Sequence, residues 1–308
     1  MGGKVPNVPE SELLNKVLIQ GIWGGFGRVY SALLKGKAVV VKHYSWNNPD
    51  HLADPIQKEG LLRKIASYHN ELAFYSSCYR ERINAAHLLG VNRKETSLIL
   101  IFEDGKGLIP NPSHHLNEDR ISKVLSFLAD LHANTLQKPW PLVGNYWHYN
   151  TRKAEWNRIR NTWLKKYASR INDTLENAQF TCLIHGDSKA SNYLMSDDAN
   201  KIVPLDFQYF GTGIGVMDLV CFCSGIIPEN DSAQFQSWVN QYFQYLKLAM
   251  MKANSPFSFQ AVKQEWSGLI PLVWADYARF LEGWTGSSFK LGKWSDLMVA
   301  RAQELLLE

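Results

Sequence analysis

The chain has 308 residues, and its 33 basic and 29 acidic side chains give a formal net charge of +4. These charges are spread along the sequence without the dense basic blocks of a nucleic-acid surface, so we expect no nucleic-acid partner. A chain of this length can bury a large core divided between two lobes.

Cysteine usage and hydropathy argue against a disulfide-rich secreted protein and against a membrane-spanning protein. The cysteines, at positions 78, 182, 221 and 223, form no paired CxxC motif and indicate no disulfide framework, which favours a reducing cytoplasm. No apolar run approaches the roughly 18 residues that span a bilayer, and the N-terminus lacks the apolar core of a signal peptide. We therefore expect a cytoplasmic protein with neither a membrane partner nor an obligate protein partner.

A glycine cluster is the first feature of the chain that suggests ligand binding. The run Gly21-Ile-Trp-Gly24-Gly25-Phe-Gly27 lies between apolar stretches. Glycines let backbone N–H groups approach phosphates closely and allow the positive φ angles of such loops. Gly24, Gly25 and Gly27 are thus candidates for a phosphate loop, although a glycine cluster taken alone favours an ordinary hairpin turn.

Lys42 follows the apolar run Ala38-Val-Val-Val41, so its ammonium group lies at the mouth of a buried strand. A buried ammonium needs an anionic partner, because an isolated one would lose its proton or destabilise the fold by several kcal/mol. Glu71 lies on a helical segment with an apolar face, whereas Glu59 lies in a charged run typical of a solvated helix face. We prefer Glu71 as the partner; a surface lysine is the alternative for Lys42.

The first hundred residues predict an antiparallel sheet and one main helix. Apolar residues alternate from Leu18 to Tyr44, residues 56–82 form a polar helical stretch, and Ser97–Phe102 resembles a buried strand. The run Glu103-Asp104-Gly105-Lys-Gly107 then breaks the pattern and suits a hinge between two lobes. Exposed backbone groups at its first two residues could bind the adenine edge of a nucleotide, and a plain loop is the alternative.

Helical periodicity prevails after residue 117. An apolar stripe runs from Ile121 to Leu131, and His132 closes the last turn, where a role in satisfying nearby polar groups is favoured over general-base catalysis. The stretch Arg152–Arg170 predicts one amphipathic helix.

Two aspartates and an asparagine follow strand-like runs in the middle of the chain. The first segment reads Cys182-Leu-Ile-His185-Gly-Asp187-Ser-Lys189-Ala-Ser-Asn192, and the second reads Val203-Pro-Leu-Asp206-Phe-Gln208. Five positions separate Asp187 from Asn192, as in the kinase catalytic loop H-R-D-x-x-x-x-N, and nineteen separate Asp187 from Asp206, enough for a hairpin that returns to the same cleft.

Phosphoryl transfer explains this spacing. A hydroxyl that attacks the γ-phosphate of ATP needs a carboxylate beside it, and the triphosphate needs Mg²⁺ held by oxygen ligands. Asp187 suits the first task, and Asn192 with Asp206 suits the second, so ATP and Mg²⁺ are the expected cofactors. His-Gly-Asp alone would indicate a polar turn, and His185 is expected to orient the loop rather than to act as a base.

These motifs resemble the aminoglycoside phosphotransferase and choline kinase superfamily. The pattern at 185–192, the Asp-Phe-Gln at 206–208 and the aromatic pair after Glu71 are most similar to its ecdysteroid-kinase-like branch. The resemblance spans most of the chain. It implies an α+β, bilobal, protein-kinase-like fold, in which a small N-lobe has an antiparallel sheet and one main helix and a larger C-lobe is mostly helical.

The resemblance also implies which function each part of the chain carries. Residues 1–104 would form the nucleotide-binding N-lobe, and residues 105–308 would carry the catalytic loop and the acceptor-binding helices. Lys42 would contact the phosphates. Asp218 would brace the catalytic loop from the following helix, with a plain N-cap or first-turn aspartate as the alternative. Lys189 departs from the bulky residue of many relatives, and we assign it no role.

C-terminal helices usually line the acceptor pocket in this superfamily. Trp274, Asp276, Tyr277 and Trp284 offer aromatic faces and charge in that region, and they suit an amino-alcohol as well as a sterol-like alcohol. Their helical spacing is also typical of plain core packing.

We therefore predict an ATP-dependent kinase that phosphorylates a hydroxyl group of a small organic acceptor. A protein kinase is the nearest alternative, but only eleven residues lie between Asp206 and Asp218, which leaves little room for an activation segment, and no Ala-Pro-Glu follows. A nucleotide-binding pseudokinase or scaffold is the other alternative, and the presence of the base, the metal ligands and the lysine argues against it.

Overall fold

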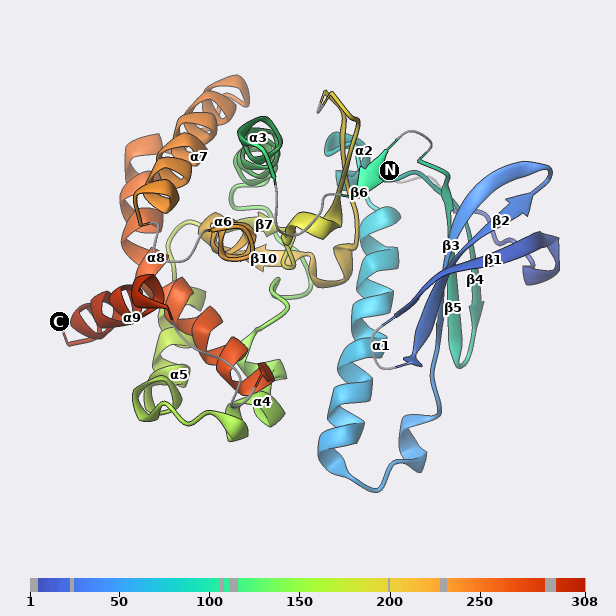
Figure 1. Ribbon diagram of the computed structural model, residues 1–308, viewed down its shortest axis with the longest axis horizontal. Helices are drawn as coiled ribbons and strands as arrows, with labels where there is room; N and C mark the ends of the chain where they lie inside the picture. The colour runs from blue at the N-terminus through green and yellow to red at the C-terminus, as the bar shows by residue number, and fades with distance from the viewer. Residues whose placement is uncertain are drawn as a thin grey trace. The chain divides into compact units, whose positions relative to one another are not determined.

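The computed structural model describes residues 5–22, 25–105, 108–110, 116–198, 200–227, 232–285 and 292–307 (Figure 1). The chain forms two compact units, the first made of residues 1–109 and 194–208 and the second of residues 110–193 and 209–308. Residues 194–208, which the expected division at residue 104 assigns to the second lobe, pack with the first unit. No helix within the described ranges is long and apolar enough to cross a membrane.

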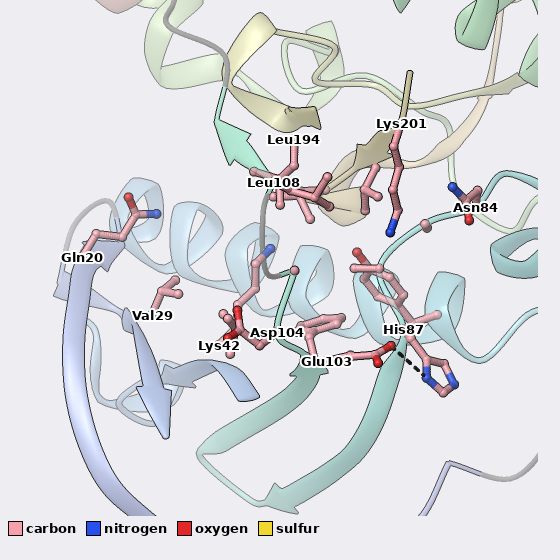
Figure 2. A pocket seen from close by; sticks show the side chains of 18 residues that line it. Gln20, Val29, Lys42, Asn84, His87, Glu103, Asp104, Leu108, Leu194 and Lys201 are labelled. Atoms are coloured by element: carbon pink, nitrogen blue, oxygen red, sulfur yellow. Dashed lines mark ion pairs between the residues drawn. The ribbon is translucent and has the colours of Figure 1, made fainter. Parts of the chain in front are cut away.

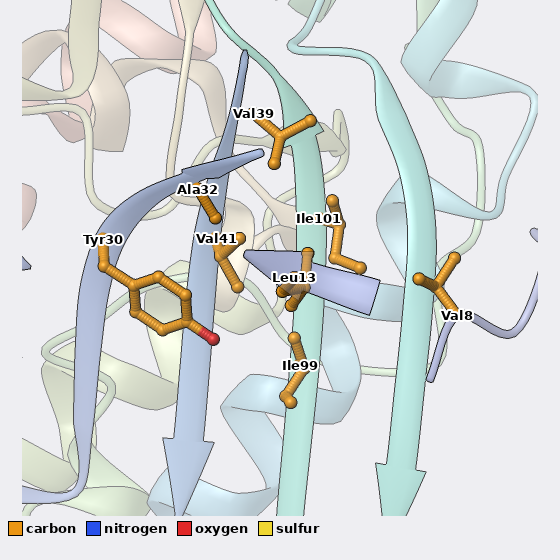
Figure 3. Close-up of a cluster of buried hydrophobic side chains, with 8 residues drawn as sticks. All are labelled: Val8, Leu13, Tyr30, Ala32, Val39, Val41, Ile99 and Ile101. Carbon is orange, nitrogen blue, oxygen red and sulfur yellow. The ribbon is translucent and has the colours of Figure 1, made fainter. Parts of the chain in front are cut away.

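The first unit contains a five-stranded antiparallel sheet in the order β1-β2-β3-β5-β4. Its strands are β1 (Leu13–Ile22), β2 (Gly27–Leu34), β3 (Lys37–Ser45), β4 (Leu88–Lys94) and β5 (Ser97–Glu103). Side chains alternate between the faces of a strand. Val39 and Val41 therefore pack into the buried cluster of Figure 3, while Lys42 points to the opposite face.

Helix α1 (Pro55–Tyr75) packs with this second face of the sheet (Figure 1). It begins where the Asp54 carboxylate accepts a hydrogen bond from the Ile56 N–H and where Pro55 occupies the first turn. The rings of Tyr44 on β3 and Tyr68 on α1 stack with centroids 3.9 Å apart. The helix thus brings Glu71, which is fully buried, toward β3.

The remainder of the first unit consists of short elements. They are α2 (Tyr79–Arg82), β6 (Ile109–Pro110), β8 (Tyr193–Met195) and β9 (Ile202–Pro204), and the last three form a small sheet in the order β6-β8-β9. The hairpin predicted between Asp187 and Asp206 is present as β8–β9, and Asp206 lies in the first unit.

The second unit is mostly helical. Its helices are α3 (Glu118–Asn134), α4 (Lys153–Arg158), α5 (Thr162–Glu176), α6 (Gly215–Ser224), α7 (Ser232–Lys252), α8 (Phe259–Thr285) and α9 (Lys293–Leu305). The predicted apolar stripe of α3 is buried. Two short antiparallel strands, β7 (Cys182–Ile184) and β10 (Gly211–Gly213), pair in its centre.

The single amphipathic helix predicted for Arg152–Arg170 was wrong, because the chain leaves the helix at Ile159 and starts α5 after Asn161. The Asn161 side chain accepts hydrogen bonds from the N–H groups of Trp163 and Leu164 and so caps a new helix. An antiparallel sheet with one main helix in the first unit and a larger helical second unit confirm the predicted α+β class.

Candidate active site

Lys42 lies in a buried ionic network within the first unit. Its Nζ is 2.7 Å from Oε1 of Glu71 and 3.1 Å from Oδ1 of Asp206. Tyr44 Oη donates a 2.6 Å hydrogen bond to the other carboxylate oxygen of Glu71. Glu71 is therefore the partner of Lys42, as preferred from the sequence, and Glu59 is exposed on the same helix.

This network fixes the charge of the lysine. Burial by itself would lower the pKa of Lys42, but the carboxylates of Asp206 and Glu71 outweigh it and hold the pKa above its ordinary value. Burial raises the pKa of Glu71, and Lys42 opposes that shift. The lysine thus stays an ammonium ion, the form that binds phosphate.

Gln208, the third residue of Asp-Phe-Gln, orients Asp206. Its side-chain amide donates hydrogen bonds to Oδ1 of Asp206 at 2.8 Å and to Oη of Tyr44 at 3.1 Å. Asn70 on α1 donates to the backbone carbonyl of Gln208 at 3.1 Å. Asp206 itself has a φ angle of +66°, which is uncommon for a residue other than glycine. No role was predicted for Gln208 from the sequence. The presence of Asp-Phe-Gln instead of Asp-Phe-Gly does not indicate which residues the glutamine side chain contacts.

A cavity of about 420 Å³ lies beside this network, within the first unit (Figure 2). Lys42 and the predicted hinge residues Glu103 and Asp104 line it together with apolar side chains, which include Val29, Val40, Phe102, Leu194 and Leu205. Its volume lies in the range of small-molecule and cofactor pockets, and its apolar walls suit a flat ring system.

The glycine cluster precedes β2 in the first unit. Gly25 has a φ angle of +76°, the left-handed conformation that favours glycine, and Gly27 opens β2 opposite Tyr44. Gly24 lies outside the described residues. Neither of the other two glycines lines the cavity of Figure 2 within the described part of the chain.

The second unit holds the His185-Gly-Asp187 turn, which follows β7. The carboxylate of Asp218, fully buried on α6, accepts hydrogen bonds from the backbone N–H of His185 at 2.6 Å and of Gly186 at 2.9 Å. His132 Nε2 lies 3.2 Å from the same carboxylate. Asp218 therefore contacts the loop directly, and His132, also fully buried, is a neighbour of Asp218.

Asp187 lies at the end of this braced turn. The side-chain amide of Asn192 donates to the Asp187 carbonyl at 2.7 Å and to Oδ2 of Asp187 at 3.2 Å. Lys189 Nζ, from the same loop, lies 2.8 Å from Oδ2. No role was predicted for Lys189 from the sequence. Only its position two residues after Asp187 indicated that the two side chains could meet.

Each unit contains one of the two side chains predicted to hold Mg²⁺. The two hydrogen bonds that Asn192 donates through Nδ2 fix its orientation and leave Oδ1 without a partner among the residues that the structure describes. Asp206 offers a carboxylate whose side chain is 29% exposed. No group of three or more His, Cys, Asp and Glu side chains within the described ranges could hold a metal. Mg²⁺ in phosphotransferases is held by one or two protein groups plus substrate phosphates, so these hard oxygen ligands fit it.

The four predicted acceptor residues on α8 differ in their surroundings. Trp274 is buried and donates to Ser295 Oγ, and Asp276 is buried against Arg279. Tyr277 is partly exposed, and burial raises the pKa of its phenol while a hydrogen bond with Ser224 opposes that shift. Trp284 is 40% exposed.

A guanidinium already covers the aromatic cluster around Trp284. The Arg152 Cζ atom lies 4.0 Å from the ring centroid of Tyr146, 5.2 Å from that of Phe280 and 5.9 Å from that of Trp284. Arg152 is 1% exposed and pairs with Glu155 at 3.1 Å. These ring faces therefore bind a cation of the chain itself.

Comparisons with known proteins identify the family of the chain and its fold. Residues 21–251 match the model of the phosphotransferase enzyme family, APH. The chain is similar to the crystal structure of an aminoglycoside-3'-phosphotransferase of type VIII, with 15% identity, a TM-score of 0.50, and coverage of 85% of this chain and 94% of that chain.

It is also similar to an aminoglycoside phosphotransferase from Streptomyces rimosus in complex with ADP and streptomycin, with 13% identity, a TM-score of 0.48, and coverage of 83% of this chain and 92% of that chain. No match was found among curated proteins. The likeness to the type VIII structure shows that the fold is the kinase-like one expected from the sequence.

Proposed function

Since the chain belongs to the phosphotransferase enzyme family, we propose that it is an ATP-dependent kinase that phosphorylates a hydroxyl group of a small organic molecule. The observation that carries this proposal is Asp187, a carboxylate at the end of a turn whose backbone N–H groups are bound by Asp218 and whose side chain contacts Asn192 and Lys189. Such a turn has little freedom to reorient. A carboxylate that positions a nucleophile must be held in one orientation.

The nucleotide is proposed to bind in the cavity of the first unit. Its apolar walls suit the adenine ring, and the backbone at Glu103 and Asp104 suits the polar edge of that ring. Lys42, held as an ammonium by Glu71 and Asp206, would bind the phosphates. The glycine cluster at 21–27 is proposed as the loop over those phosphates, by analogy with the family.

Asp206 and Asn192 are the residues proposed to hold Mg²⁺, which when bound neutralises charge on the triphosphate. Gln208 would keep the Asp206 carboxylate in one orientation through its 2.8 Å hydrogen bond. The Asn192 amide would present Oδ1, because Nδ2 is committed to Asp187.

Asp187 is the proposed catalytic base. The acceptor oxygen forms a bond to the γ-phosphorus, the bond from that phosphorus to the β–γ bridging oxygen breaks, and the hydroxyl proton passes to the Asp187 carboxylate, which leaves ADP and a phosphomonoester. Lys189, half-exposed and 2.8 Å from the base, supplies positive charge beside the transferring phosphoryl group.

Tyr277 is the predicted acceptor residue that we propose to border the acceptor, because its side chain, unlike those of Trp274 and Asp276, is partly exposed. Trp274 and Asp276 are buried against other groups of the chain, and the rings around Trp284 are covered by Arg152. This favours an acceptor that needs no aromatic cage for an ammonium group at Trp284. Amino-alcohols, sterol-like alcohols and other alcohols remain within the proposed class.

Three narrower statements are also part of the proposal. Placement in the ecdysteroid-kinase-like branch rests on the Asp-Phe-Gln and His-Gly-Asp patterns and on the aromatic pair after Glu71. A reducing, cytoplasmic location rests on four free cysteines, three of them buried. A small-molecule acceptor, rather than a protein, rests on the short segment between Asp206 and Asp218.

The test is acceptor-dependent release of ADP. Purified protein is first titrated with Mg-ATP in a thermal-shift experiment, where binding to the native state raises the Tm. ADP release is then measured across a library of alcohols and amino-alcohols, and mass spectrometry identifies a product heavier by one phosphate. Nucleotide binding without turnover on any acceptor would instead support a scaffold role, and no nucleotide binding would refute the kinase.

A further inference from the structure

A second cavity lies entirely within the helical unit, bordered by α5, α8, strand β10 and the segment 143–148. Its volume is about 210 Å³. That is more than one water molecule needs and less than the volume of most pockets for drug-sized ligands. Residues 185–192 do not border this α5–α8 cavity within the described part of the chain, so it is separate from the proposed base Asp187.

Asn172 on α5 turns an unsatisfied carboxamide toward this cavity. The residue is only 6% exposed and borders the cavity, yet its side chain makes no hydrogen bond to any residue in the described ranges. Neither polar atom of this amide is among the fully buried side-chain atoms that lack a partner, so both stay accessible from the cavity. The amide offers one acceptor and two donor positions to a ligand.

Asp276 on α8 supplies a fixed carboxylate to the same cavity. The residue is 3% exposed, its Oδ1 accepts a hydrogen bond from Nε of Arg279 at 2.8 Å, and Nη2 of Arg279 lies 2.8 Å from the same oxygen. Oδ2 has no partner among the described residues. The fully buried Arg279, which also donates to the Trp147 carbonyl at 2.7 Å, therefore locks the carboxylate with one oxygen left to accept a hydrogen bond.

The remaining border of the cavity is acidic and apolar. His148 Nε2 lies 2.7 Å from Oε1 of Glu176, which is partly exposed at 40%. Val143, Leu175 and Met217 add apolar surface, and no lysine or arginine borders the cavity within the described ranges. Both carboxylates have partners within the chain, because Asp276 is paired with Arg279 and Glu176 lies beside His148. The remaining oxygen of Asp276 can still accept a hydrogen bond, and a carboxylate oxygen forms its strongest hydrogen bonds with charged donors such as an ammonium group.

We propose that the α5–α8 cavity is a binding site for a small hydroxylated amine, distinct from the site of phosphoryl transfer. The ligand's ammonium group donates to Oδ2 of Asp276, and its hydroxyl groups exchange hydrogen bonds with the Asn172 carboxamide. A skeleton of a few carbon atoms lies against Leu175 and Met217. Neither Asp276 nor Asn172 takes part in the proposed reaction, so the inference stands whether or not the chain is a kinase.

Met217 provides a site-specific reporter for the test. The protein, labelled with ¹³C at its methionine methyl groups and without nucleotide, is titrated with 2-amino-1,3-propanediol, and the Met217 resonance is assigned with a Met217→Leu variant. We expect a saturable shift with a dissociation constant on the order of 1–10 mM, as suits so small a ligand. Glycerol, which replaces the ammonium with a hydroxyl, is expected to bind at least about tenfold more weakly.

Three variants separate this site from the catalytic one. Asn172→Leu is expected to weaken binding at least about tenfold, and Asn172→Asp to strengthen it through added negative charge. The matched exposed substitution Asn134→Leu on α3 and the substitution Asp187→Asn are expected to leave binding unchanged. The inference is overturned if the Met217 resonance does not shift, if glycerol binds equally well, if Asn172→Leu binds normally, or if Asp187→Asn abolishes binding.

Discussion

The ammonium group of Lys189 lies 2.8 Å from Oδ2 of Asp187, two residues earlier in the same loop. Asn192 donates to that same oxygen at 3.2 Å. One oxygen of the carboxylate proposed as the base is therefore already held by two donors. Since the Lys189 side chain is 48% exposed, it has room to leave the carboxylate and to follow charge that develops on a phosphoryl group.

Lys189→Met tests that role. We expect kcat to fall by about 10²-fold, the usual effect of removing one preorganised donor from a transition state, while the Tm changes little because an exposed ion pair contributes only about 0–1 kcal/mol. Steady-state kinetics and thermal unfolding check the two effects. Lys247→Met, an exposed substitution on α7, serves as the control, and an unchanged kcat in Lys189→Met would remove the lysine from the mechanism.

Asp187→Asn removes the proposed base with little change in shape. The amide cannot accept the hydroxyl proton, so kcat is expected to fall by about 10²- to 10⁴-fold, and the affinity for Mg-ATP is expected to stay close to that of the wild type. ADP release measures the first quantity and a thermal-shift titration the second. The control is Asp119→Asn, in the exposed first turn of α3; full activity of Asp187→Asn with the true acceptor contradicts the assignment.

The sequence predicted those parts of the site that depend on local spacing. Lys42 ends an apolar run, and the helical position of Glu71 faces the sheet, so burial and charge together predicted an ion pair that the structure contains. The His185-to-Asn192 interval likewise predicted that Asn192 lies near Asp187. Asn192 is close to Asp187 in the sequence, whereas Lys42 and Glu71 are 29 positions apart and were matched because a buried charge needs a partner of opposite charge.

Contacts between distant segments could not be predicted in the same way. Gln208 bonds to Tyr44, 164 positions earlier in the sequence, and nothing in the composition of either segment indicates that pairing. The cation over the rings near Trp284 comes from Arg152, the residue directly before α4. The helix expected for Arg152–Arg170 is interrupted because the Asn161 side chain bonds to backbone N–H groups and caps a new helix. The periodicity of apolar residues does not reveal such a side-chain cap.

Gln208→Leu tests whether the third residue of Asp-Phe-Gln positions Asp206. The leucine loses the bonds to Asp206 and Tyr44, so we expect kcat to fall by about tenfold and the Mg²⁺ concentration needed for half-maximal rate to rise, because an unrestrained carboxylate must be ordered on binding. Kinetics at varied Mg²⁺ measure both. Gln236→Leu, exposed on α7, is the comparison, and an unaltered Mg²⁺ dependence in Gln208→Leu would show that Asp206 needs no such support.

Asp218→Asn is expected to damage both stability and activity. One carboxylate accepts two backbone N–H groups and faces His132, whereas an amide has a single acceptor oxygen and would leave a buried donor unpaired. We expect the free energy of unfolding to drop by about 2–5 kcal/mol and kcat to fall as the turn loosens. Urea unfolding and initial rates check this, and wild-type values for both would mean that Asp218 is a simple first-turn aspartate.

Gly186→Ala tests whether the His185-Gly-Asp187 turn requires a glycine at its centre. Gly186 has a φ angle of +79°, and a Cβ atom built there would overlap the Tyr209 carbonyl oxygen and lie 2.8 Å from the Asn145 nitrogen. Both neighbours are backbone atoms that cannot rotate away, so strain and displacement are expected to lower the free energy of unfolding by more than about 2 kcal/mol and to abolish turnover.

Gly268→Ala is the matched control, because that glycine lies inside α8 with nothing within 4 Å of its added Cβ. There alanine should stabilise the protein by about 0.5–1 kcal/mol through its helix propensity. The two substitutions add the same methyl group and are expected to change the urea midpoint in opposite directions. A Gly186→Ala protein as stable and active as the wild type would show that the turn relaxes easily and that Asp187 is not held in place by its backbone.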